Sequence, residues 1–229
     1  HRDRGPRRPP ARRGLSAMPA VLPRTGARVV VKVGGSHVAD RARIATILRE
    51  LSASPMRSVV VPGGGPFADA VREAQGALAF SDRLAHRFAL EAMTTFARVL
   101  AELFPMLVVA ETRAEIDAVH AAGRIPVWSV ARLVHGMAGV PESWAVTSDS
   151  LAALLAWEID AAGLVLVKSM DGPEAASAAD LTAAGVTDDA FFDFAGRLAC
   201  PIRLVGPATL AGLGELLADP RRRIGTVVT

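Results

Sequence analysis

Lysine is almost absent from this sequence. Only two of its 26 basic side chains are lysine, Lys32 and Lys168, and the other 24 are arginine. Both lysines stand at the end of an apolar run, "VVVK" and "LVLVK". A general bias toward arginine explains why lysine is scarce, but it does not explain why the two exceptions occupy such similar places. Their positions indicate a shared function.

Cysteine and long apolar runs are scarce as well. The single Cys200 allows no intrachain disulfide, and we expect it to fill core space. No apolar run approaches the roughly 20 residues of a membrane span, and no continuous apolar stretch follows the first basic residues, as a secretory signal requires. With 51% hydrophobic and 21% charged residues, the sequence predicts a globular protein of a reducing cytoplasm.

Acidic residues are rare at the start of the chain. Residues 1–28 contain eight Arg and one Asp, a net charge of +7, so residues 29–229 carry −4 of the chain's total of +3. The start is rich in Arg, Pro and Gly and has no hydrophobic periodicity, which predicts a disordered basic leader over residues 1–27. Met18 is a candidate natural start, and a nucleic-acid arm is the weaker alternative.

In the rest of the chain, short β-rich runs alternate with helical patterns. The runs are almost continuously apolar, as burial on both faces of a parallel sheet requires. We therefore predict an α/β fold, a three-layer α-β-α sandwich with a mainly parallel central sheet, in a single domain over 28–229. The predicted strands are 29–33, 58–61, 106–110, 125–128, 163–167, 202–205 and 225–228, and the predicted helices are 37–51, 66–79, 84–103, 113–122, 148–161, 187–199 and 207–218.

A glycine-rich turn follows the first predicted strand, in "KVGGSHVAD". Gly34 and Gly35 form the turn, and Ser36 stands where a helix would begin. Glycine lets the backbone approach an anion closely, and the free N–H groups of a helix start attract phosphate. A tight turn with a capping serine is the structural alternative. We favour phosphate binding.

The second predicted strand is followed by a similar turn, "VVVPGGGPFADAV", in which Gly63, Gly64 and Gly65 precede a helical pattern. Gly63, Gly65 and Ala68 match the dinucleotide fingerprint, but helical sequence continues where that fingerprint needs a strand and an acidic residue. The Walker loop is absent too, because both lysines follow valine. The sequence therefore disfavours a dehydrogenase or a P-loop enzyme.

Asp149 lies among three hydroxyl side chains in "SWAVTSDSLAALLAWEI", where a helix should begin. A helix N-cap with Asp149 complementing the helix dipole would explain this composition. The functional alternative is that Asp149 points at Lys32 and Lys168 and fixes their orientation. The sequence leaves both interpretations open.

Lys168 is followed by a turn with Asp171 and Gly172 in "LVLVKSMDGP". The carboxyl end of a parallel strand is where α/β sheets bind ligands, so a lysine there is better explained by an anion than by packing. Lysine is also a flexible point charge that can follow a phosphoryl group, whereas arginine is a rigid fork.

These features together resemble the amino acid kinase superfamily over residues 28–229. The features are the two glycine-rich turns, the lysine on the first strand, the hydroxyl-Asp cluster, the lysine ahead of "MDG" and the terminal "IGTVV". The resemblance implies an acceptor-binding half at about 28–140 and a nucleotide-binding half at about 141–229, separated by the irregular stretch 129–147. It also implies an ATP-dependent phosphotransferase with Mg²⁺, forming a homodimer or higher oligomer.

Two segments, "PESWAVTSDSLAALLA" and "KSMDG", look most like the small kinases of methanofuran-type cofactor biosynthesis. Those enzymes phosphorylate [5-(aminomethyl)furan-3-yl]methyl phosphate to the diphosphate. This chain has Ala145 where we expect an acidic residue in those relatives, which leaves the acceptor's amine or the metal without a partner. The alternatives are another acceptor, namely isopentenyl phosphate, UMP or an amino acid carboxylate, and a non-catalytic nucleotide or oxyanion binder.

The resemblance also implies roles for single residues. Lys32 would stabilise the moving γ-phosphoryl group, Lys168 would hold the nucleotide phosphates, and Asp149 would orient both lysines. Magnesium would bridge the nucleotide phosphates without a dedicated cluster of protein ligands. Phosphate or nucleotide contacts are assigned to Gly34, Gly35, Ser36, Ser148, Ser169, Asp171, Gly172, Gly225 and Thr226, and acceptor contacts to Gly63, Gly64, Gly65, His37 and Trp144.

Overall fold

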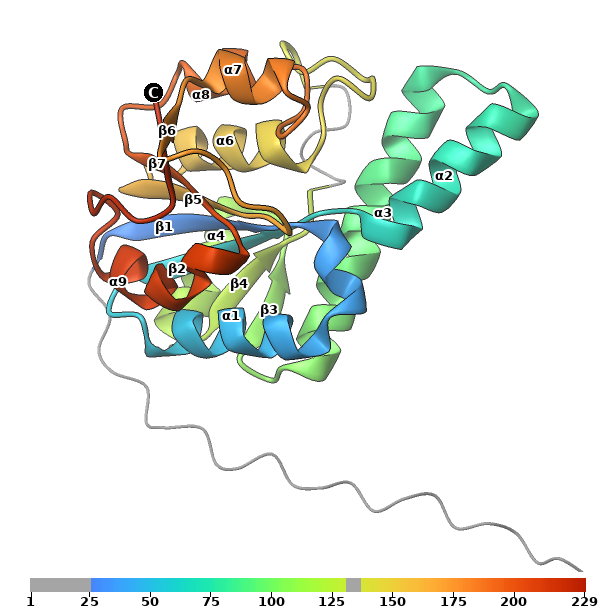
Figure 1. The fold of residues 1–229 in the computed structure, drawn as a ribbon. Helices are drawn as coiled ribbons and strands as arrows, with labels where there is room; N and C mark the ends of the chain where they lie inside the picture. The colour runs from blue at the N-terminus through green and yellow to red at the C-terminus, as the bar shows by residue number, and fades with distance from the viewer. Residues whose placement is uncertain (1–25, 131–136) are drawn as a thin grey trace, which may run out of the picture.

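The computed structural model describes residues 26–130 and 137–229, and these residues form an eight-stranded sheet (Figure 1). Most of the predicted leader, with Met18, lies outside the described residues, as does part of the predicted irregular stretch 129–147. The strand order is β3-β4-β2-β1-β5-β7-β8-β6, and only β7 and β8 pair antiparallel. The strands are β1 (Arg28–Val33), β2 (Arg57–Pro62), β3 (Leu107–Ala110), β4 (Ile125–Trp128), β5 (Gly163–Val167), β6 (Ala175–Ala176), β7 (Ile202–Val205) and β8 (Thr226–Val228).

Helices cover both faces of the sheet, which confirms the predicted α/β sandwich. Figure 1 shows α6, α7 and α8 on one face and α1 and α9 on the other. The helices are η1 (Gly35–Ala39), α1 (Arg41–Ala53), α2 (Gly65–Leu78), α3 (Asp82–Leu103), α4 (Arg113–Ala121), α6 (Ser148–Glu158), α7 (Ala178–Ala183), α8 (Phe191–Ala195), η2 (Pro207–Gly212) and α9 (Leu213–Ala218).

The sheet separates two apolar cores because side chains alternate along each strand. In β1, Val29, Val31 and Val33 face the core that α1 and α9 close, whereas Val30 faces the core that contains α6. β5 follows the same rule, with Leu164 and Leu166 on the α6 face. Each central strand is therefore buried on both sides, as its apolar sequence requires.

The α2/α3 hairpin projects from the body of the protein (Figure 1). Pro66 occupies the first turn of α2, and Ala79 ends the helix in the left-handed conformation, with φ of 53°. Ser81 then caps α3 by accepting a hydrogen bond from the N–H of Leu84. The hairpin forms one wall of a cavity at the two glycine-rich turns.

Several elements differ from the sequence prediction. All seven predicted strands are present, whereas the two-residue β6 and the short helix α7 were not predicted. The helix predicted at 187–199 is reduced to α8, Phe191–Ala195, and the helix predicted at 37–51 is split at Asp40, which caps α1. The first six residues of the helix predicted at 207–218 form the 3₁₀ helix η2.

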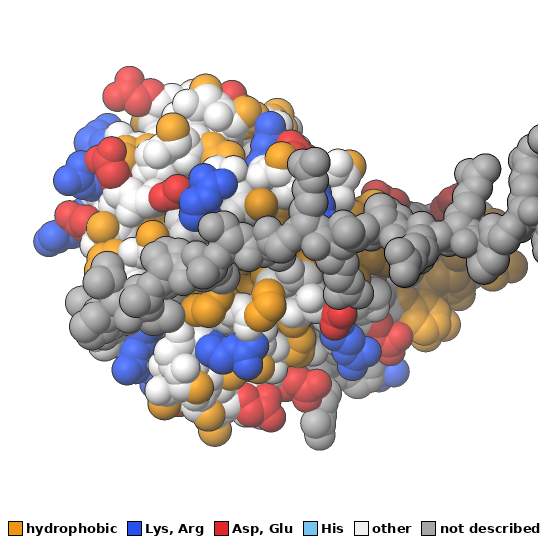
Figure 2. Space-filling model, turned by 90° about the horizontal axis from the view of Figure 1, so that it is seen from below, with side chains coloured by type: hydrophobic (Ala, Val, Ile, Leu, Met, Phe, Trp, Pro, Cys, Tyr) orange, Lys and Arg blue, Asp and Glu red, His pale blue; other side chains and the backbone are white. Residues whose placement is uncertain are grey.

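Charged side chains of both signs are interspersed over the visible part of the face in Figure 2. That mixture matches a body in which acidic and arginine residues nearly balance. Among the described residues, no helix combines the length and the apolar character that crossing a membrane requires.

Candidate active site

The strand register brings the two lysines together. β1 and β5 are parallel neighbours in which Lys32 lies beside Leu166 and Val33 beside Val167. Lys168 is the next residue after β5, so it continues the face of Leu164 and Leu166, to which Lys32 also belongs. Both ammonium groups consequently emerge at the same edge of the sheet, on the face covered by α6.

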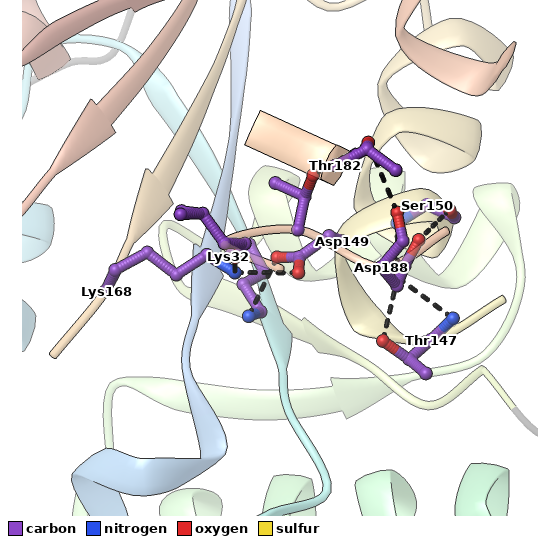
Figure 3. Close-up of polar contacts among 9 residues, drawn as sticks. Lys32, Thr147, Asp149, Ser150, Lys168, Thr182 and Asp188 are labelled. Carbon is purple, nitrogen blue, oxygen red and sulfur yellow. Dashed lines mark hydrogen bonds and ion pairs between the residues drawn. The ribbon is translucent and has the colours of Figure 1, made fainter. Parts of the chain in front are cut away.

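Asp149, in the first turn of α6, points its carboxylate at both lysines (Figure 3). Its Oδ1 is 2.9 Å from the Nζ of Lys32, and its Oδ2 accepts a hydrogen bond of 2.7 Å from the Nζ of Lys168. Lys168 donates a second bond of 2.7 Å to the carbonyl of Val186. Lys32 and Asp149 are each only 5% exposed, so this ion triplet is a buried feature.

The electrostatics of the triplet are strongly coupled. Burial by itself would raise the pKa of Asp149, but Lys32 and Lys168 outweigh burial and hold that pKa below its usual value. Burial and, next, the charge of Lys32 lower the pKa of Lys168, Asp149 opposes both, and the net result is a pKa of about 8. One carboxylate therefore stabilises two ammonium groups incompletely, and the site keeps an excess positive charge.

The two glycine-rich turns touch backbone to backbone beside the triplet. A Cβ at Gly35 would lie 2.1 Å from the amide nitrogen of Gly65, and one at Gly63 would lie 2.5 Å from the amide nitrogen of Gly35. Gly65 also has a φ of +52°, which side chains rarely adopt. The glycines are thus required for this close approach, whatever they bind.

A cavity of about 260 Å³ opens at the two turns. It brings together predicted residues of two kinds, the phosphate contacts Gly35, Ser36 and Ser148 and the acceptor contacts Gly63, Gly64, Gly65 and Trp144. The remaining walls come from α2, α3 and the residues that enter α6, Val146 and Thr147. Residues not predicted from the sequence also line it, among them Asp69, Arg72 and His86.

Trp144 is held in the cavity wall by α2. Its Nε1 donates a hydrogen bond of 2.7 Å to Oε1 of Gln75, and the guanidinium of Arg72 lies 4.2 Å from the centre of its ring. Arg72 in turn pairs with Asp69 at 3.0 Å. A cation–π contact of this kind depends on helix spacing and loop position together, so the sequence pattern did not reveal it.

The predicted nucleotide residues lie across β5 from the cavity, where β7 and β8 meet. A Cβ at Gly172 would be 2.5 Å from Oγ1 of Thr226, and Gly225 adopts a φ of +69°. Thr226 is 1% exposed, and its Oγ1 has no hydrogen-bond partner among the described residues. Asp171 accepts a bond of 3.0 Å from the N–H of Ala208, which fixes the neighbouring turn, and Ser169 is exposed after Lys168.

Three residues that were predicted to contact a ligand, Gly34, Gly63 and His37, are either hydrogen-bonded to the sheet or buried away from the cavity. The N–H of Gly34 donates to the carbonyl of Val167 at 3.1 Å, and the N–H of Gly63 donates to the carbonyl of Val33 at 2.8 Å. These two donors tie the turns to the sheet, so Gly35 and Ser36 are better placed to donate to a ligand. His37 is 1% exposed and does not line the cavity, and burial lowers its pKa.

Asp188 is a further site residue that the sequence did not reveal. Its carboxylate accepts hydrogen bonds from the backbone and the hydroxyl of Thr147 and of Ser150, on either side of Asp149 (Figure 3). Asp188 therefore caps the start of α6, while Asp149 lies in the first turn of the helix and also pairs with both lysines. Asp188 is 38 residues from Ser150, so no local pattern linked them.

The chain is similar in sequence to a known family and to a protein of known activity. The model of the Amino acid kinase family matches residues 27–172. The chain belongs to the amino acid kinase family. It is also 27% identical, over 144 residues, to the [5-(aminomethyl)furan-3-yl]methyl phosphate kinase of Methanocaldococcus jannaschii. That match covers 62% of this chain and 66% of the relative, just under two thirds of the relative's length.

Solved structures share the fold of this amino acid kinase family member. The uridylate kinase from Archaeoglobus fulgidus superimposes with a TM-score of 0.66 at 20% identity, over 88% of this chain and 99% of that one. UMP kinase from Bacillus anthracis gives 0.65 at 16% identity, over 89% and 96%. Aspartate kinase from Synechocystis gives 0.62 at 16% identity, over 89% of this chain and 40% of that one.

Proposed function

We propose that this protein is an ATP-dependent phosphotransferase that transfers the γ-phosphoryl group to a small phosphate acceptor, [5-(aminomethyl)furan-3-yl]methyl phosphate being the first candidate. The observation that carries the proposal is the buried triplet of Lys32, Asp149 and Lys168 beside a glycine-lined cavity. The family membership and the relative in Methanocaldococcus jannaschii support it.

The charge of the triplet favours a polyanionic ligand. Two ammonium groups share one carboxylate, and burying an unbalanced charge is costly unless another charge compensates it. The lowered pKa of Lys168 shows that its ammonium form is incompletely stabilised by Asp149 and the surrounding groups. Phosphate oxygens entering this site would supply the missing negative charge.

The residues also fit a nucleotide on structural grounds. The turns at Gly35 and Gly65 leave no room for a Cβ, and the buried hydroxyl of Thr226, near Gly172, has no hydrogen-bond partner in the part of the chain that the structure describes. For Mg²⁺, no group of three or more His, Cys, Asp or Glu in residues 26–130 and 137–229 is arranged to hold a metal ion. We therefore assign the ion to phosphate oxygens and water rather than to a protein cluster.

The catalytic work of the protein is positioning and charge neutralisation. When bound, ATP would supply the phosphoryl group and Mg²⁺ would neutralise part of its charge. Lys32 would stabilise the charge on the transferred group, Lys168 would hold the nucleotide phosphates, and Asp149 would keep the two ammonium groups apart. An acceptor phosphate is already a nucleophile at neutral pH, so without a general base its oxygen can form the new P–O bond to the γ-phosphorus, while the bond from that phosphorus to the β,γ-bridging oxygen breaks and ADP leaves.

The cavity also offers a partner for an acceptor that carries an amine. Ala145 removes the acidic residue expected beside Trp144, but the carboxylate of Asp69 lines the same cavity. It is paired with Arg72 at 3.0 Å and is largely exposed, so it can turn toward a ligand. We assign Asp69 to the amine of the acceptor, and Gly35, Ser36 and Lys32 to its phosphate.

Phosphorus NMR of the purified protein tests the proposal. The protein is incubated with Mg-ATP and, separately, with the aminomethylfuran phosphate, isopentenyl phosphate or UMP. We expect new coupled diphosphate signals with the furan compound alone. The Lys32→Ala variant, with its fold verified by circular dichroism, is the control and should give none in the same time.

Each outcome separates the parts of the proposal. Diphosphate formed from another acceptor would retain the phosphotransferase and reject the furan substrate. ATP that binds without turnover on any of the three acceptors would instead favour a non-catalytic nucleotide binder. Equal turnover by the Lys32→Ala variant would reject the role given to Lys32.

A further inference from the structure

The loop between α7 and α8 contacts the catalytic triplet and the start of α6 at once. The carbonyl of Val186 accepts the hydrogen bond from Lys168, and two residues later the carboxylate of Asp188 binds the first turn of α6. One short loop therefore touches both Lys168 and the helix that carries Asp149. Through these contacts the loop can hold Lys168 and the start of α6 in fixed positions relative to each other.

The carboxylate of Asp188 accepts four hydrogen bonds. Its Oδ2 accepts from the N–H of Thr147 at 2.9 Å, from the hydroxyl of Thr147 at 2.7 Å and from the N–H of Ser150 at 3.1 Å. Its Oδ1 accepts from the hydroxyl of Ser150. Thr147 is the N-cap of α6 but forms no side-chain cap bond itself, so Asp188 supplies the cap from another segment.

The geometry fixes the residues on both sides of Asp149. Thr147 and Ser150 bracket it in the first turn of α6, and Asp188 holds both (Figure 3). A second bond, from the N–H of Ala190 to the carbonyl of Ala145, ties the same loop to the chain entering the helix. A shift of this helix start would move the carboxylate that both lysines contact.

We propose that Asp188 is a positioning residue, which fixes the first turn of α6 so that Asp149 holds Lys32 and Lys168 at the separation the reaction needs. Asp188 acts through Asp149 and contacts no reacting atom in this scheme. The inference deepens the proposed function, but the placement of the lysines can be measured without any turnover.

The composition of the chain makes that measurement simple. Lys32 and Lys168 are the only lysines, so lysine labelled with ¹³C at Cε gives two signals from the full 229-residue protein. The Lys32→Arg variant assigns them by removing one. The charged groups that act on Lys168 are Lys32 and Asp149, and its pKa of about 8 gives a titration that NMR can follow.

Asp188→Asn is the first variant, because it keeps the shape of the side chain and removes its charge. We expect the midpoint of Lys168 to fall by about half a pH unit, a fraction of the one to three units that an opposite charge in contact contributes. The exposed neighbour Asp189 provides the matched control. Asp189→Asn should leave both lysine signals unchanged.

Thr147→Val separates positioning from a direct effect of charge. It keeps the carboxylate of Asp188 and removes one of its donors, so a smaller fall in the same midpoint must arise from movement of the helix start. Asp180→Asn is the control for simple loss of stability, because Asp180 belongs to the capping box of α7. The Asp180→Asn protein should unfold at a lower denaturant concentration, while the titration midpoint of Lys168 stays at the wild-type value.

The outcomes are distinct from those of the proposed function. A Lys168 midpoint that stays at the wild-type value in folded Asp188→Asn and Thr147→Val protein would overturn the positioning role, whether or not the protein is a kinase. If Asp188→Asn does not fold, Thr147→Val decides alone. Where turnover is present, we expect kcat to fall about tenfold in Asp188→Asn with the nucleotide KM nearly unchanged, because misplacement acts on the transition state.

Discussion

The two faces of the central strands end in different residues, although they belong to the same chain segments. On the face toward α1 and α9, β1 and β5 end in Val33 and Val167, which are buried in an apolar core. On the face toward α6, Lys32 and Lys168 occupy the corresponding ends. Alternation along a strand thus lets one face supply stability and the other supply charge within a few ångströms.

The difference also shows what a buried charge needs. The valines need only close packing, whereas the lysines are accompanied by Asp149 and the carbonyl of Val186. Substitutions on the α6 face should therefore lower turnover, whereas substitutions on the α1 and α9 face should lower stability.

Removing the charge of Lys32 should have the largest effect on turnover. We expect Lys32→Ala to lower kcat by roughly 10²- to 10³-fold, the scale of losing one donor to a transition state, with folding intact. Val31→Ala, one residue away on the opposite face, should instead cost roughly 2 kcal/mol of stability and leave kcat near the wild-type value. Steady-state kinetics and urea unfolding of both variants measure the contrast, and equal effects on kcat would contradict it.

Removing Asp149 should disturb both lysines. We expect Asp149→Asn to lower kcat by roughly 10²-fold, because the ammonium groups lose their shared carboxylate. The pKa of Lys168 should fall below about 8, since Asp149 is the group that raises it. Titration of ¹³C-labelled lysine checks this, and an unchanged midpoint for Lys168 would show that the ion pair is absent in solution.

Alkaline pH should weaken nucleotide binding. Lys168 loses its charge as the pH rises through about 8, so the affinity for Mg-ATP should fall up to about tenfold per pH unit above that value. Stability should respond in the opposite sense. Between about 8 and the usual lysine pKa the unfolded chain binds more protons, so the contribution of Lys168 to stability rises with pH.

Calorimetry at pH 7 and pH 9 measures the affinity, and denaturant unfolding at the same values measures the stability. A nucleotide affinity that is equal at both pH values would reject the assignment of Lys168 to the phosphates.

The smallest effect is expected at the rim of the cavity. Asp69→Asn should raise KM for the aminomethylfuran phosphate about threefold, because an exposed ion pair contributes only a fraction of a kcal/mol. An analogue without the amine should bind both forms equally. A KM that rises by the same factor for both compounds would assign the effect to the freed Arg72 instead.

Much of the fold could be predicted from sequence because the signals are local. The apolar runs predicted all seven strands longer than two residues, since burial on both faces of a parallel sheet requires nearly continuous apolar sequence. The extent of α8 was overestimated because the composition of 187–199 is helical, whereas Asp188 is drawn into a loop by α6. Tertiary contacts overrode propensity there.

For the site, the amino-acid sequence was enough to show which residues carry charge and where glycine-rich turns follow the strands. Lys32 and Lys168 stood out because they are the only two lysines of the chain and each ends an apolar run. The folded chain was needed to show that Asp149 joins them, that Asp188 caps α6, and that Trp144 packs against Arg72. Those contacts join segments far apart in the chain, and local patterns carry no information about such distances.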